Sequence, residues 1–108
     1  LDTAAAGGGW VAGPKLMTPR YYHAVASIGT KLYAAGGALY HGHGAVTSSV
    51  EVLDTAVGGG WTPALPLATA RFELGLAAIG TKLFAVGGCE TGCLEPIGSV
   101  EILDTAAG

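Results

Sequence analysis

Short apolar runs, separated by glycine and polar residues, dominate the chain. In its first half these runs cover residues 24–28, 32–35 and 50–53. Each run has the length of a β-strand and is too short for an ordinary helix. Gly29-Thr30 stands between the first two runs, where a hairpin turn is expected. The pattern therefore predicts an all-β chain.

The apolar runs are nearly continuous and do not alternate with polar residues. Residues 74–79, Leu-Gly-Leu-Ala-Ala-Ile, show this most clearly. A sheet with one face in water has alternating strands, whereas a sheet covered on both faces has uniformly apolar ones. We therefore expect sheets that stack face to face.

One pattern is written twice along the chain. Arg20 returns as Arg71, residues 28–32 return as 79–83, and the Trp10 and Gly36-Gly37 positions also recur fifty-one residues later. Residues 50–55 return as 100–105 at a spacing of fifty, so one residue is lost in the intervening loop. A period of about 50 residues indicates a repeat array, in which each unit buries its apolar surface against its neighbours.

The repeat consists of an arginine, Leu-Tyr/Phe-Ala-x-Gly-Gly, Val-Glu-x-Leu-Asp and, after a glycine triplet, a tryptophan that we place on a fourth strand. This pattern resembles the kelch motif, and the resemblance spans most of the chain. It implies β-propeller blades of four antiparallel strands, a to d. On this basis residues 1–16 supply the end of a strand c and a strand d for a neighbouring blade, residues 20–67 form a full blade, and residues 71–106 form strands a to c of a second.

Two blades are too few to close a propeller, which needs about four. They would leave an open strand edge and two uncovered faces. We expect other blades to complete the ring, supplied by identical copies or by the rest of a longer chain. Residues 1–4 duplicate residues 103–106. Joining the two ends would therefore give one strand end too many, which favours a window from a longer array.

Composition limits the classes of partner. Only 12% of residues are charged, the formal net charge is −3, and five Lys and Arg residues form no basic stripe. We therefore expect neither nucleic acid nor a membrane as a partner. No apolar run reaches the ~18 residues of a membrane span. There is no serine nucleophile elbow, and the glycine triplets precede strands, so they lack the helix N-terminus of a phosphate cradle.

Residues written in both repeats are assigned to the fold. Tryptophan needs a shallow neighbour, and glycine pairs let a ring or a second backbone approach closely. The aspartates can accept backbone N–H groups where the third strand ends. The structural set is Trp10, Gly36, Gly37, Glu51, Asp54, Trp61, Gly87, Gly88, Glu101 and Asp104.

The two arginines admit two roles. Arg20 and Arg71 either bond to neighbouring carbonyls, or to Glu51 and Glu101 across blades, or they offer a guanidinium to an acidic peptide or carboxylated ligand.

Residues that differ between the repeats are candidates for ligand binding. The kelch resemblance implies a binding surface made of the d–a and b–c loops, and the two repeats diverge in those loops. The candidates, with the two arginines, are Arg20, Tyr21, Tyr22, His23, Tyr40, His41, His43, Arg71, Phe72, Glu73, Glu90 and Glu95.

The cysteine pair leaves several states open. Cys89 and Cys93 have the spacing of a local disulfide, which would favour a secreted or extracellular protein. They could also join His41 and His43 in a zinc site between blades, or remain free thiols. Some kelch proteins are copper radical oxidases with a linked Tyr–Cys pair. Tyr40, His41 and Cys89 have the right types, but no motif places them.

The favoured function is a protein-interaction module without catalysis or cofactor, which binds an unknown protein or carbohydrate ligand through its loops. An alternative is a structural unit that assembles into a ring or filament by strand donation. A second alternative is part of a carbohydrate enzyme, an oxidase or epimerase, on the same scaffold.

Overall fold

The computed structural model describes residues 9–39, 45–90, 93 and 95–106. These residues form strands and turns without any helix, which confirms the prediction of an all-β chain. Within this part of the chain no helix is long and apolar enough to cross a membrane. The strands are β1 (Ala24–Ile28), β2 (Lys31–Ala35), β3 (Val50–Asp54), β4 (Thr62–Ala64), β5 (Gly75–Ile79), β6 (Lys82–Val86) and β7 (Val100–Asp104).

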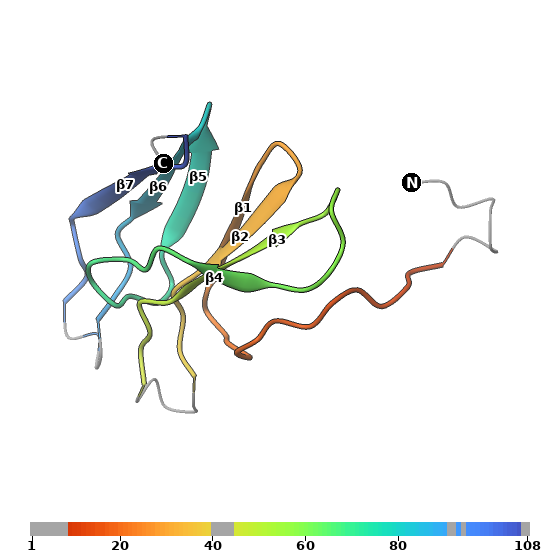
Figure 1. Cartoon of the computed structure of the whole chain (residues 1–108). Coiled ribbons are helices and arrows are strands. Elements are labelled where there is room, and N and C mark those ends of the chain that lie inside the picture. The colour runs from red at the N-terminus through yellow and green to blue at the C-terminus, as the bar shows by residue number, and fades with distance from the viewer. Residues whose placement is uncertain (1–8, 40–44, 91–92, 94, 107–108) are drawn as a thin grey trace.

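The strands form two antiparallel sheets, each built from consecutive strands (Figure 1). The first sheet has the order β1-β2-β3-β4, and the second has the order β5-β6-β7. The predicted blade architecture is confirmed, with one four-stranded and one three-stranded sheet. The described residues do not form a closed ring.

Two-residue turns connect the first two strands of each sheet. Ile28 pairs with Lys31, so Gly29-Thr30 forms the turn as predicted. Gly29 has a φ of 58°, a left-handed conformation that glycine adopts without steric cost. The equivalent Gly80 has a φ of 60°. The same turn chemistry therefore fixes the register of both hairpins.

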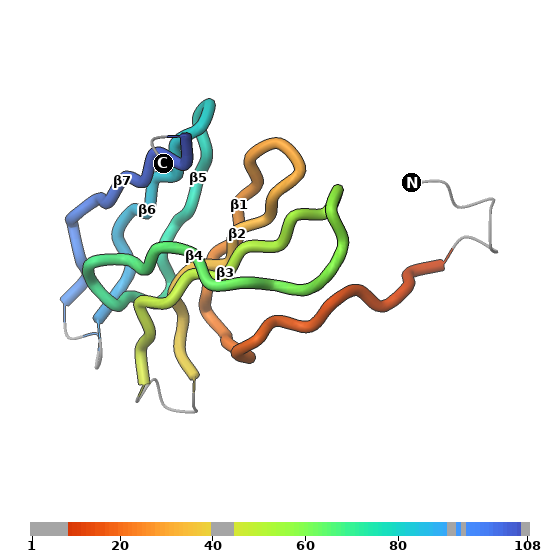
Figure 2. The backbone as a smooth tube through the Cα atoms, viewed as in Figure 1, coloured from red at the N-terminus to blue at the C-terminus, as the bar shows by residue number. Residues whose placement is uncertain are grey.

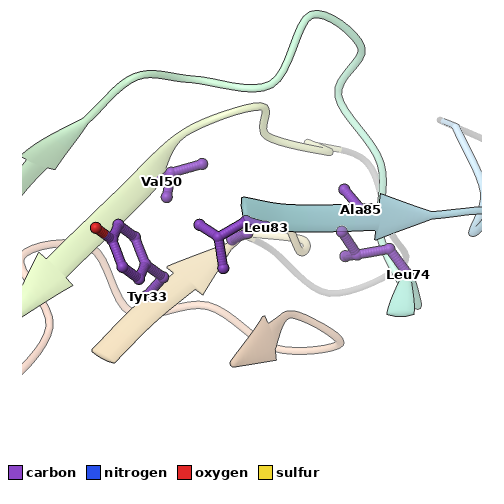
Figure 3. Close-up of a cluster of buried hydrophobic side chains, with 6 residues drawn as sticks. Tyr33, Val50, Leu74, Leu83 and Ala85 are labelled. Atoms are coloured by element: carbon purple, nitrogen blue, oxygen red, sulfur yellow. The ribbon is translucent and has the colours of Figure 1, made fainter. Parts of the chain in front are cut away.

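The core lies between the two sheets, and both contribute to it. The first sheet supplies Tyr33, Ala35 and Val50, and the second supplies Leu83 and Ala85 (Figure 3). Leu74, just before β5, completes the cluster. Burial of this apolar surface holds the sheets together. The predicted face-to-face stacking is confirmed.

The first glycine pair accommodates a second backbone. Gly37 donates its N–H to the Arg71 carbonyl at 2.9 Å, which links the two sheets. A Cβ at Gly36 would lie 2.5 Å from the same oxygen, and both glycines have positive φ. We expected either a ring or a second backbone to approach this glycine pair, and the structure shows a backbone there.

The tryptophans are placed differently from each other. Trp10 is 97% exposed within the chain, so its packing against a shallow neighbour stays a prediction. It lies on a segment that leaves the sheets in Figure 2, where the chain is coloured red to orange. Trp61 lies one residue before β4 and donates its indole N–H to the Pro14 carbonyl at 3.0 Å. The described residues 9–16 form no strand within this chain, and residues 1–8 lie outside the described ones; the strand predicted there for a neighbouring blade stays a prediction.

Candidate ligand-binding face

A buried arginine cross-links the first blade. The Arg20 guanidinium donates to the carbonyls of Gly36 and Ser49, both at 2.9 Å, and pairs with Glu51 at 2.7 Å. Glu51 also accepts the backbone N–H groups of Met17 and Thr18. This carboxylate therefore fixes the segment that enters the blade, and the charges of the pair compensate each other away from water.

The second blade repeats the arrangement. Arg71 donates to the carbonyls of Gly87 and Ser99, both at 3.0 Å, and pairs with Glu101 at 2.9 Å. Glu101 accepts the backbone N–H groups of Ala68 and Thr69. Both arginine side chains are fully buried. The expected bonding to neighbouring carbonyls is confirmed, whereas each ion pair lies within one blade, so the expected pairing across blades was wrong. Neither guanidinium is exposed at the surface.

A serine that was not predicted from the sequence takes part in each cross-link. The Ser49 hydroxyl accepts from Arg20 at 2.9 Å, and the Ser99 hydroxyl accepts from Arg71 at 3.0 Å. The signal was present, because Ser-Val-Glu occurs in both repeats at the same spacing as the rest of the third strand. The structural assignment of repeated residues extends to these serines.

Short backbone bridges lie on one side of the molecule. In each blade they bring the d–a loop, which precedes the first strand, next to the b–c loop, which connects the second and third strands. Tyr21 bridges to Ala38, and Ala38 bridges to Val46. In the second blade Phe72 bridges to Cys89, and Cys89 to Pro96. In Figure 1 the described ends of both b–c loops leave the sheets opposite the hairpin turns. The side that carries these bridged residues, with the d–a and b–c loops that contain them, is called the loop face.

Two equivalent residues of the loop face have an unusual backbone. Tyr22 has a φ of 58° and Glu73 a φ of 56°, although neither is glycine. The Glu73 N–H donates to the Tyr22 carbonyl at 2.7 Å, so the two residues meet where the blades join. Tyr22 is 47% exposed, and Glu73 is exposed. Both blades adopt this conformation at the same repeat position, but the side chains differ.

Aromatic rings and a histidine lie next to these residues. The Tyr22 ring centroid lies 5.0 Å from that of Tyr21 and 6.1 Å from that of Phe72, and Phe72 is buried. His23 is partly buried. Burial, and secondarily the positive charge of Arg20, hold the pKa of His23 below its ordinary value. This histidine is therefore uncharged near neutral pH and contributes no cation to the loop face.

The second blade's b–c loop contains a disulfide and two carboxylates. Cys89 and Cys93 are joined, which selects the disulfide among the three predicted states. Their sulfur atoms are therefore not available as zinc ligands or for a thioether to Tyr40. Glu90 lies between the two cysteines, Glu95 follows Cys93, and both are exposed. Among the described residues, no three His, Cys, Asp or Glu side chains are grouped as metal ligands.

Three predicted candidates, Tyr40, His41 and His43, lie outside the described residues. They belong to the b–c loop of the first blade, between Leu39 and Ala45, whose backbones are joined by a 2.9 Å hydrogen bond. Their place in the binding surface stays a prediction.

The predicted aspartate role is confirmed at the hairpin end of both sheets. Asp54 accepts from the Thr30 hydroxyl at 2.8 Å and from the Ala56 N–H at 3.0 Å. These hydrogen bonds hold the pKa of Asp54 below its ordinary value. Asp104 accepts from Ala106 and Thr81, in that order of effect, and its pKa is lowered likewise. Both carboxylates close a turn.

Comparison with known proteins supports the blade assignment. The family model for the Kelch motif matches residues 19–56, which contain Arg20, the three strands β1 to β3 and Glu51. A search among curated proteins found no match. Residues 19–56 are therefore a kelch motif, and both antiparallel sheets are consistent with kelch blades.

Proposed function

We propose that this chain is part of a non-catalytic binding module, in which kelch blades form a rigid frame and the loop face binds a partner protein. The observation that carries the proposal is the pair Tyr22 and Glu73. These two residues keep large side chains at a backbone conformation that favours glycine, and their backbones are joined by a hydrogen bond.

Their backbone conformation has an energetic cost. A residue with a Cβ in the left-handed region costs about 1–2 kcal/mol relative to an ordinary conformation. Apart from these two residues and Cys93, the positive-φ positions among the described residues carry glycine, as at Gly36 and Gly88. Since the fold alone is served equally by glycine, the retained side chains support a role in contact with a ligand.

The charges of the face indicate the chemistry of the partner. Glu73, Glu90 and Glu95 are exposed acids of the second blade, while Arg20 and Arg71 are neutralised inside the blades. The exposed Tyr22 ring can stack on a planar or cationic group. This combination supports binding of a cationic segment of a partner protein. A cationic partner thus takes the place of the acidic ligand that exposed arginines would have favoured.

The remaining features support a rigid frame rather than a reaction centre. The carboxylates that recur in both blades are engaged in the arginine cross-links and the turns. The disulfide shapes the b–c loop of the second blade and supports an oxidising compartment.

Selection of a random-peptide display library on the protein tests the proposal. The comparison variant carries Tyr22→Gly and Glu73→Gly, which remove the side chains and suit the positive φ. A matched control, Val57→Gly, changes an exposed apolar residue next to the hairpin end. We expect lysine- and arginine-rich peptides to bind the wild type and the control but not the double variant, while all three proteins unfold cooperatively on heating. Peptides that bind all three proteins equally, or an absence of enrichment, would contradict the proposal. Enrichment of glycans in a parallel array would favour a carbohydrate ligand instead.

A further inference from the structure

The second sheet has an open edge and an uncovered apolar face. In the first sheet β3 pairs with both β2 and β4, whereas β7 pairs only with β6 among the described residues. Val50 is 6% exposed, but the equivalent Val100 is 49% exposed. Ile79, Val86 and Ile102 are exposed on the same face. An edge and face of this kind favour association with another chain.

The N-terminal segment has exposed apolar residues that belong to no sheet of the chain. Trp10 and Val11 are almost fully exposed, and the segment from residue 9 to residue 16 forms no strand. Its end is nevertheless held in the repeat's own geometry. Met17 and Thr18 donate to Glu51 as Ala68 and Thr69 donate to Glu101. The residues before them therefore correspond to Trp61 and β4.

We propose that residues 10–13 of a second copy of this chain add to the β7 edge as its missing fourth strand. The register follows from the first blade, where Val50 pairs with Ala64 and Val52 with Thr62. Shifted by the repeat, Val100 pairs with Gly13 and Ile102 with Val11 of the second copy. The backbone groups of β7 that lack partners are then paired across the chains.

A tryptophan site lies at the end of this register. In the first blade the Trp61 indole donates to the Pro14 carbonyl, and Leu65 is the repeat equivalent of Pro14. Leu65 is exposed and lines an apolar cavity of about 450 Å³ together with Ile102 and Leu103. Trp10 of the second copy, placed opposite Leu103, therefore meets this apolar surface and donates its indole N–H to the Leu65 carbonyl.

The faces of the two copies also match. Val50 and Ala35 of the first sheet pack against Leu83 and Ala85 of the second within one chain. Their equivalents Val100 and Val86 are exposed, and the first sheet presents exposed Val25 on its opposite face. The contact between copies would repeat the contact within the chain. Since its two sides differ, it propagates head to tail and gives a closed ring or an open filament.

Two variants with opposite defects test this contact. Trp10→Ser removes the donor side chain, which touches nothing in the protomer, and Ile102→Asp places a charge on the acceptor face. We expect the wild type to sediment as an oligomer and each variant alone to sediment as a monomer of 10.7 kDa. Mixing the variants leaves one functional donor and one functional acceptor. The mixture should therefore form a complex of two chains only.

A peptide of residues 9–18 provides a second readout. It should bind the Trp10→Ser protein, and its own Trp10→Ser version should bind about tenfold more weakly or worse. Val57→Ser, at an exposed apolar position away from β7, is the control and should assemble like the wild type. The proposal is overturned if the wild type stays monomeric at its highest soluble concentration. It is also overturned if both variants assemble normally or if their mixture stays monomeric.

Discussion

The two blades share a repeated sequence pattern and the same strand register but differ in what covers them. Ala35 and Val50 of the first blade are buried, whereas their equivalents Val86 and Val100 are about half exposed. The strands themselves pair in the same way, as the β2–β3 and β6–β7 registers show. The comparison teaches that a blade's internal structure comes from its own sequence, but its burial comes from the next blade.

The largest expected difference concerns the buried carboxylates. Glu51→Ala leaves the Arg20 charge unpaired in a dry site, and removal of one partner of a buried ion pair costs about 3–5 kcal/mol. Glu101 is partly exposed in the equivalent pair, so water can solvate Arg71 in Glu101→Ala and the loss should be smaller. Urea denaturation followed by circular dichroism measures both. Equal losses would show that the first blade is not better shielded than the second.

A second difference concerns the first glycine of each pair. Both residues have positive φ, but a Cβ at Gly36 meets the Arg71 carbonyl, whereas one at Gly87 lies 3.3 Å from its nearest neighbour, the Ile97 carbonyl. Gly36→Ala should therefore cost about 2–3 kcal/mol, and Gly87→Ala about 1 kcal/mol from backbone strain. The free energy of unfolding of each variant tests this. Similar values would mean that the approach of the second blade imposes no steric demand.

A third comparison uses the valines of the third strands. Val50→Ala should destabilise by about 1–2 kcal/mol because the residue lies in the core, and Val100→Ala by less than half of that. Both are best measured in the Trp10→Ser background, where the proposed contact between copies is absent. In the wild-type background the effect of Val100→Ala should grow. An unchanged effect there would argue against burial of Val100 by a second copy.

The smallest expected effect is a pH dependence confined to the first blade. The pKa of His23 lies below its ordinary value of 6.5, so the unfolded chain binds a proton more readily than the folded one. The contribution of neutral His23 to the free energy of unfolding should be fully present above pH 6.5. It should be lost as the pH falls below this value. His23→Leu, which copies Leu74 of the second blade, should remove this dependence. Thermal unfolding between pH 7.5 and 5 tests it, because the aspartates, with lowered pKa values, stay ionised there.

The repeat made much of the fold predictable. The strands, the two glycine turns and the aspartate caps follow from local pattern and backbone preference, which act within a few residues. The arginine cross-links were only half predictable. The residue types were correct, but the choice between partners within a blade and across blades depends on how far each side chain reaches. The same holds for Tyr22 and Glu73, whose positive φ has no mark in the sequence.

By itself, the sequence determined two equivalent β units, because turn residues and apolar runs act locally and recur at a fixed spacing. Only the tertiary structure decided which surfaces are dry. Val50 and Val100 carry the same side chain on the same strand position, and their exposure differs because burial depends on what lies against the sheet. The tertiary structure also buries both arginines away from the loop face. A carboxylate compensates the charge of each guanidinium there, and carbonyl groups accept its hydrogen bonds.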